Sequence, residues 1–276
     1  MSGLLINYNA AAVAAYNNLD QTSANLTQTV GQLSSGLQIQ SAADNPSGYV
    51  VGQSLQMEAN GYTQAISNAQ NAVSVLQTAQ GALGQEATIL QTMNTLATQA
   101  ANGGSQSASS QAAAQAEFAS LTSQLDQIAS STNYGGTSLL NGSYSGTFQV
   151  GPYNQTVDQI TVAISGSGST ALLGSTALSL STTTGAQAAM AAVQTAIGTV
   201  ATIAASVGAS QNEITAVSAN LTTAQQNIQS AHANLVDVNV AQMTSQFTSQ
   251  QILEQAGVSI LAQASQLPSL AQKLLP

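Results

Sequence analysis

The chain has 276 residues, of which only 4% are charged: ten Asp or Glu stand against one Lys or Arg, Lys273. The net charge of −9 excludes a basic surface for nucleic acid, because neutralising phosphates requires clustered Lys and Arg. Hydrophobic residues reach 43%, which excludes extensive disorder, and aromatics reach only 4%, so any core must be built from small aliphatic side chains.

Residues 3–41 predict one amphipathic helix, because apolar positions recur every three and four residues. One set is Leu19, Leu26 and Leu33, and the complementary set is Tyr16, Ser23, Val30 and Leu37. A seven-residue apolar repeat needs a second helix alongside it. No basic segment precedes the stripe, so we expect no cleaved signal peptide. The residues expected to drive packing here are Leu19, Leu26, Leu33 and Leu37.

A break is expected at 41–48, because Pro46 disfavours helix at the residue before it and Gly48 frees the backbone. A long helix is then predicted over 56–102 and a third helix over 111–131. The residues expected to pack in these two helices are Leu76, Leu83, Leu90, Phe118, Leu121 and Leu125.

The segment 134–184 has a different texture, with short apolar–polar alternation. Ile160, Val162 and Ile164 are separated by single residues, and Gly151-Pro152 supplies a turn. This pattern predicts one or two β-hairpins.

Two further helices are predicted, over 186–236 and over 237–274. Pro268 lies inside the second and should cost a hydrogen bond or produce a kink. Neither reaches about 18 uninterrupted apolar residues, so we expect no membrane-spanning helix. The packing residues expected are Ile214, Leu221, Ile228 and Leu235 in the first helix, and Leu253, Ile260, Leu267 and Leu274 in the second.

The order of these elements predicts a mainly α fold, an elongated helical hairpin or coiled coil with a small β-hairpin insert. The two outer helices can meet only if the chain folds back on itself. The apolar stripes at both ends indicate that the terminal helices carry the functional interaction surface. The same stripes could also pack into an ordinary monomeric bundle.

Catalytic and metal sites have little support in the sequence. There is no Cys and a single His, His232, so we expect no metal site and no cofactor. His232 could form a triad with Asp237 and a Ser, but a surface or interface histidine is favoured. Gly166 to Ala171 fits a nucleotide-binding glycine pattern without the strand–helix context, so we interpret it as a turn. We therefore expect no enzymatic activity.

Four segments, in family order, resemble bacterial flagellin, the subunit of the flagellar filament. They read LSSGLQIQSAAD, LATQAANG, YGGTSLLNG and QILEQAG with LAQA and QLP following. The resemblance covers about residues 1–142 and 186–276. The four segments begin at Leu33, Leu96, Tyr134 and Gln251.

The resemblance implies an extracellular filament subunit with two layers of helices. Residues 1–45 and 237–276 would form an inner coiled-coil tube, called D0. Residues 46–142 and 186–236 would form D1, and 143–185 a short β-rich variable insert. The implied partners are other copies of the chain, an export chaperone, the cap complex and hook-junction proteins, with type III export, no nucleic acid and no membrane insertion.

Two alternatives remain at the level of sequence. A hook–filament junction protein shares the terminal helices. A non-flagellar secreted helical adhesin or translocator is the alternative from another class, and a translocator would usually show a membrane-length apolar segment.

The chain departs from the family in its charges. Thr92 and Asn94 stand where Arg is usual, and Thr95 where Glu is usual, in the region that the innate receptor TLR5 binds in the family; weak recognition is therefore expected.

The loss of charge fits an acid habitat, where carboxylates with pKa values of about 4 are neutral, or resistance to proteases that cut after Lys or Arg. O-linked sugar on Ser or Thr of 143–184 is a further expectation.

Overall fold

The computed structural model describes residues 9–104, 106–174 and 178–273, with side chains described up to residue 266 in the last helix. Leu274 and the side chain of Leu267 therefore lie outside the described residues. The described chain is mainly α, as predicted, and divides into two compact units. The first comprises the described residues within 1–57 and 227–276, and the second comprises 58–226.

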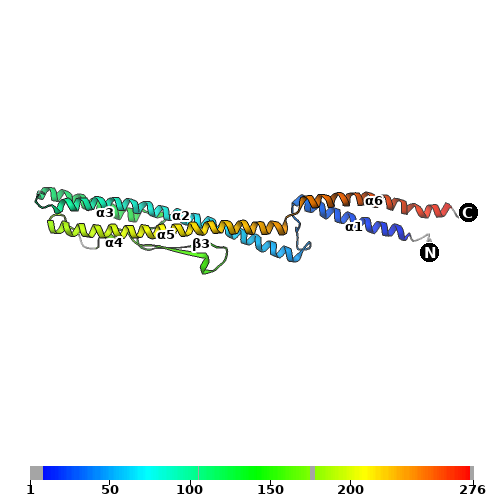
Figure 1. Ribbon diagram of the computed structural model, residues 1–276, viewed down its shortest axis with the longest axis horizontal. Coiled ribbons are helices and arrows are strands. Elements are labelled where there is room, and N and C mark those ends of the chain that lie inside the picture. The colour runs from blue at the N-terminus through cyan, green and yellow to red at the C-terminus, as the bar shows by residue number, and fades with distance from the viewer. Residues whose placement is uncertain (1–8, 105, 175–177, 274–276) are drawn as a thin grey trace. The chain divides into compact units, whose positions relative to one another are not determined.

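The first unit is built on two long helices that lie side by side, α1 (Ala10–Ser35) and α6 (Val240–Lys273) (Figure 1). They are antiparallel, because Asn9 Nδ2 donates to the carbonyl of Ala264 at 2.6 Å while Leu37 pairs with Asp237 at the other end. Asn9 also caps α1, since its Oδ1 accepts from the Ala12 N–H at 3.1 Å. One side chain thus starts the helix and ties it to its partner.

Helix α1 ends at Ser35 and not at residue 41, so the sequence prediction was wrong about its end. Gly36 has a φ of 75°, a conformation that glycine adopts without strain, and its N–H donates to the Gln32 carbonyl. Leu37 consequently leaves the helical stripe. The chain beyond it pairs with the segment just before α6, with Gln38 N donating to Val236 O at 2.7 Å.

Helix α2 (Pro46–Ala101) begins at Pro46 and not at residue 56. Asn45 Oδ1 accepts from the Gly48 N–H at 2.9 Å, which caps the helix. Pro46 then occupies the first helical position, where its missing N–H has no partner to lose. Asn45-Pro46 therefore starts a helix, and the predicted break is confined to the residues before it.

The second unit packs the greater part of α2 against α3 (Ala108–Ser131) and α5 (Thr183–Val236). The α2 and α5 helices run antiparallel, since Gln225 Nε2 donates to Thr63 Oγ1 at 2.6 Å and Thr98 Oγ1 contacts Met190 Sδ at 3.4 Å. Small residues fill much of the buried core, as the composition predicted. These include Ala69, Ala72, Ala79, Ala97, Ala186, Ala189 and Ala196.

Two antiparallel hairpins follow α3, which confirms the sequence prediction. The first joins β1 (Asn133–Tyr134) to β2 (Thr137–Ser138) through Gly135 and Gly136, whose φ values of 57° and 84° suit a two-residue hairpin turn.

The second hairpin pairs β3 (Tyr144–Gln149) with β4 (Gln159–Ile164), with Tyr144 opposite Ile164. The apolar residues of β4 are buried and alternate with exposed ones, so this hairpin lies with one face on the core. Two short helices flank β4, η1 (Thr156–Asp158) before it and α4 (Ser169–Leu173) after it.

Candidate assembly interface

The contact between α1 and α6 is a heptad seam, which we call the inner seam. Its members step by three and four along each helix and are buried or half-buried. This is the spacing of a coiled coil. The inner seam consists of Ala12, Ala15, Leu19, Thr22, Leu26, Thr29 and Leu33 on α1, and Met243, Phe247, Gln250, Glu254, Gly257, Leu261 and Ala264 on α6.

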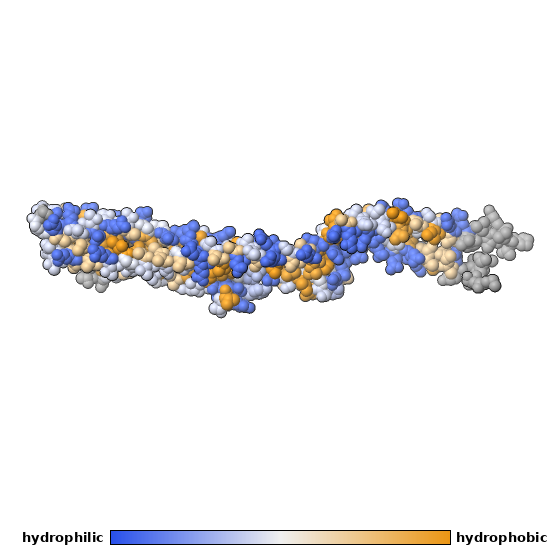
Figure 2. Space-filling model, in the orientation of Figure 1, coloured by the Kyte–Doolittle hydropathy of each residue, from blue (hydrophilic) through white to orange (hydrophobic). Residues whose placement is uncertain are grey.

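Further apolar side chains on the same two helices are exposed and have no partner within the described chain. Tyr16 on α1 is 60% exposed, and Leu253 and Ile260 on α6 are 56% and 57% exposed. Figure 2 shows several hydrophobic residues at the surface of these helices, separated by hydrophilic ones. We call these exposed side chains together the outer stripe: Val13, Tyr16 and Val30 on α1, and Ile252, Leu253, Val258 and Ile260 on α6. By their heptad positions, Tyr16 and Val30 flank the inner seam on one side of the antiparallel pair, and Leu253 and Ile260 flank it on the other.

The structure divides the predicted interface residues between these two sets of residues. Leu19, Leu26 and Leu33 lie in the inner seam, and Leu37 lies half-buried in the segment after α1. Leu253 and Ile260 belong to the outer stripe. The sequence did not separate the two sets of residues. Ala15 and Tyr16 lie four and three residues before Leu19, so both fit a heptad pattern with steps of three and four.

The predicted packing residues of the long helices fall mainly in the core of the second unit. Leu121 is half-buried against that core, and Ile228 and Leu235 are half-buried in the first unit. The residues buried in the core are Leu76, Leu83, Leu90, Phe118, Leu125, Ile214 and Leu221.

The turn between α1 and α2 is held by one carboxylate. Asp44 Oδ2 accepts from Ser41 N at 2.9 Å and from Gln40 N at 3.1 Å, and Asp44 Oδ1 accepts from Gln28 Nε2 at 3.3 Å. These bonds, led by that from the Ser41 backbone, hold the pKa of Asp44 below its usual range. The turn is therefore fastened by a charged group, which sequence reasoning had assigned no role.

Comparison with known proteins identifies the fold that carries this interface. The model of the bacterial flagellin N-terminal helical region matches residues 6–145, and that of the C-terminal helical region matches residues 190–275. The chain belongs to the bacterial flagellin family. Both stretches that the flagellin models match include a terminal helix of the inner seam.

Individual relatives agree with this assignment. Flagellin B of Vibrio cholerae is 38% identical over 147 residues, which are 53% of this chain and 39% of that protein. Polar flagellin F of Vibrio parahaemolyticus is 38% identical over 149 residues, covering 54% and 39%. The matches thus span about two fifths of the length of these flagellins.

Two solved structures share the fold. Bacillus cereus flagellin aligns with a TM-score of 0.51 and 27% identity, covering 60% of this chain and 94% of that one. A putative flagellar hook-associated protein from Vibrio parahaemolyticus aligns with a TM-score of 0.58 and 13% identity, covering 70% and 100%. The second likeness shows the fold alone.

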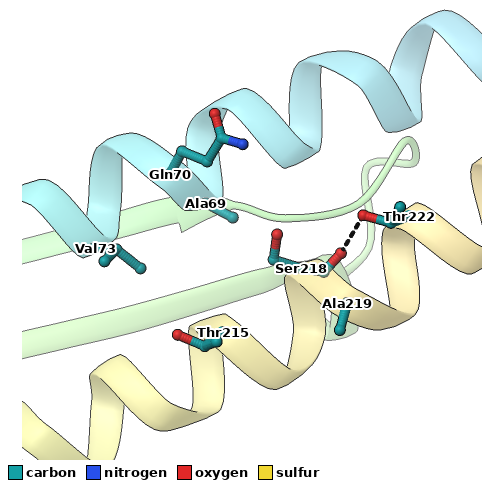
Figure 3. A pocket seen from close by; sticks show the side chains of 7 residues that line it. All are labelled: Ala69, Gln70, Val73, Thr215, Ser218, Ala219 and Thr222. Atoms are coloured by element: carbon teal, nitrogen blue, oxygen red, sulfur yellow. Dashed lines mark hydrogen bonds between the residues drawn. The ribbon is translucent and has the colours of Figure 1, made fainter.

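A groove of about 420 Å³ lies between α2 and α5 in the second unit (Figure 3). Ala69 and Val73 face Thr215, Ser218 and Thr222 across it. The Thr222 hydroxyl donates to the Ser218 carbonyl at 2.9 Å, so it is satisfied within its own helix. The side chains that line it are apolar, amide or hydroxyl groups, none of them ionisable near neutral pH.

The single histidine lines a smaller cavity of about 360 Å³ in the first unit. Its neighbours there include Leu37, Tyr49 and Gln53. Within the part of the chain that the structure describes, no three His, Asp or Glu side chains gather as they would around a metal ion.

Helix α5 differs from expectation in one respect. It is long and apolar enough, by length and composition, to cross a membrane, although the sequence predicted no such helix. Polar residues interrupt its apolar run, but the mean hydropathy of its most apolar stretch stays high enough for a membrane-spanning helix. Of the most apolar stretch, 28% is buried within the described chain.

Proposed function

We propose that the chain is a structural subunit that polymerises into the extracellular filament of the bacterial flagellum and serves motility. The observation that carries this proposal is the outer stripe. The fold has already filled its inner seam, yet Leu253 and Ile260 remain more than half exposed on a regular helix. Exposed apolar side chains seven residues apart on one helix are typical of a helix–helix interface.

The energetics favour assembly by repetition. Fully burying one Leu, Ile or Val side chain contributes about 1.5–3 kcal/mol. The outer stripe offers seven apolar side chains on each subunit. A subunit inside a filament has neighbours on several sides, so these contributions recur around it, whereas the isolated chain leaves them in water. Head-to-tail contacts that do not close on themselves produce an open helical polymer.

Within such a filament we assign the terminal helices, 1–45 and 237–276, to an inner coiled-coil tube. The segments 46–142 and 186–236 form the surrounding helical layer, and 143–185 forms a short outer insert. The near absence of charge on the outer stripe means that shape and amide hydrogen bonds set its register, because coiled coils otherwise choose partners through flanking Glu and Lys.

Other partners follow from the same role. A cytoplasmic chaperone covers the C-terminal helix before type III export, a cap complex folds arriving subunits, and hook-junction proteins connect the filament to the hook. Nucleic acid has no place in the proposal, because one Lys or Arg in 276 residues offers no basic patch. No catalytic role and no cofactor are proposed.

Recognition by TLR5 is expected to be weak. Thr92, which replaces the usual Arg, is exposed on α2 and bonds only along its own helix, with Oγ1 donating to the Thr88 carbonyl at 3.2 Å. A receptor reporter assay on purified monomer checks this, and a response equal to that of a charged flagellin would contradict it.

The function itself is tested by adding filament seeds to the purified full chain and examining the product by negative-stain electron microscopy. Long tubes support a filament subunit. Short caps that stop growing would favour a hook–filament junction protein. Monomers that float with lipid vesicles would favour a secreted adhesin or translocator that inserts α5.

A further inference from the structure

One carboxyl group lies in the core of the second unit. Glu86 on α2 and Ser167, which follows β4, are both 0% exposed. Ser167 Oγ donates to Glu86 Oε1 at 2.8 Å, whereas Glu86 Oε2 has no hydrogen-bond partner. The nearby helix faces are lined with apolar side chains, so the free oxygen faces a medium that does not solvate charge.

No positive charge compensates Glu86. The segment 58–226 contains no Lys, Arg or His. The titratable groups on the elements packed around it are Glu117 and Asp126 on α3, Glu213 on α5 and Tyr144 on β3. The three carboxyl groups are exposed and none is cationic, so ionising Glu86 would leave an unpaired buried charge.

Glu86 also holds a particular piece of chain, the turn 166–169. Ser167 N donates to the Leu140 carbonyl at 3.0 Å, and a Cβ on Gly166 would lie 3.1 Å from Gly142 Cα. On its exposed side the turn is held by Asp126, which accepts from Ser169 N and Ser169 Oγ, both at 2.8 Å. Glu86 is the anchor that enters from the core.

We propose that Glu86 is a pH-dependent tie between α2 and the chain returning from the β3–β4 hairpin. In its neutral form it holds the turn 166–169 on the core, and in its ionised form it loosens that attachment. The end of the β3–β4 hairpin is thus held on the core in acid, and its attachment loosens as the pH rises.

The direction follows from burial. Burial raises the pKa of Glu86 to about 7, against the opposing effect of the Ser167 hydrogen bond. A neutral carboxyl leaves at most one O–H unsatisfied, which costs less than an unpaired charge. Because the pKa in the folded state exceeds the ordinary value of 4.5, the stabilisation is complete below pH 4.5 and is lost as the pH rises through about 7.

The first test needs no variant. The carboxyl carbon of Glu86 is followed by carbon-13 NMR during a pH titration of the full-length monomer. The proposal predicts a midpoint near neutrality, well separated from the exposed carboxyl groups. A midpoint below about pH 5 would overturn it.

The second test measures the tie itself. Hydrogen exchange gives protection factors for the amides of residues 164–169 in the native chain, in Glu86→Gln and in Glu213→Gln, which alters an exposed carboxyl group of the same unit. In the native chain and in Glu213→Gln, protection should fall roughly 50-fold between pH 5 and pH 8.5, by linkage to a pKa shift from about 4.5 to about 7. In Glu86→Gln it should stay level. Equal pH slopes in Glu86→Gln and the native chain would refute the proposal. Both measurements use the monomer, so their outcome does not depend on whether the chain assembles into filaments.

Discussion

Leu19 of α1 packs directly over Gly257 of α6: a Cβ built on Gly257 would lie 3.2 Å from Leu19 Cδ1. The absence of a side chain at Gly257 therefore sets how closely the two helices approach in the inner seam. The Asn9 bond to Ala264 lies nearer the free end of the same pair. The packing of Leu19 against Gly257, which has no side chain, thus fixes the register of α1 against α6.

The substitution Gly257→Leu should push α1 and α6 apart and destabilise their pairing by about 1–3 kcal/mol, the usual effect of overpacking a contact. Gly84→Leu is the matched control, because nothing lies within 4 Å of a Cβ at Gly84. Chemical denaturation followed by helical circular dichroism measures both variants. Equal stability of the two would show that the close approach has no energetic role.

The Asp44 turn predicts a loss of order in acid. Because its hydrogen bonds hold the folded-state pKa below 3.8, their stabilisation is present above that value and is lost as the pH falls through the folded-state pKa. Asp44→Asn should reduce the hydrogen-exchange protection of the Gln40 and Ser41 amides at neutral pH. Unchanged protection in Asp44→Asn would contradict the assigned role.

Glu86 predicts the opposite dependence. At pH 8, Glu86→Gln should raise the free energy of unfolding of the second unit by about 3 kcal/mol, since a shift from 4.5 to about 7 amounts to about 1.4 kcal/mol per unit. At pH 4 the two proteins should be equally stable within about 0.5 kcal/mol. Urea denaturation at the two pH values measures this, and a variant less stable than the native chain at pH 8 would count against the account.

The sequence predicted the long helices and one or two hairpins, because hydrophobic periodicity reports directly on buried faces. It did not predict where α1 ends, since the end depends on the left-handed backbone of Gly36. It read Pro46 as a breaker, although proline in the first turn starts a helix. It also merged the inner seam with the outer stripe, and which of two adjacent stripes is used within the chain depends on the three-dimensional pairing.

Glu86 was missed for a different reason. A single Glu in a long helix has the sequence appearance of a solvated residue. Only the position of the β3–β4 hairpin, which brings Ser167 over it, reveals that it is buried.

The depletion of charge predicts filaments that tolerate acid. With few basic groups, protonation of the carboxylates leaves little net charge and so little repulsion between packed subunits. Assembled filaments should remain intact from about pH 3 to pH 8 by sedimentation. Disassembly at pH 3 would favour the alternative explanation, protease resistance, which digestion by an enzyme specific for Lys and Arg would examine.

The central claim is that the outer stripe joins subunits to one another. Sedimentation of seeded Leu253→Asp and Ile260→Asp tests it most directly, with Val157→Asp as the control because Val157 on the insert is 83% exposed. All three variants should keep the helical content and stability of the native monomer. The account predicts that Val157→Asp sediments as filament while Leu253→Asp and Ile260→Asp stay in the supernatant. Filaments formed equally well by all three would contradict it.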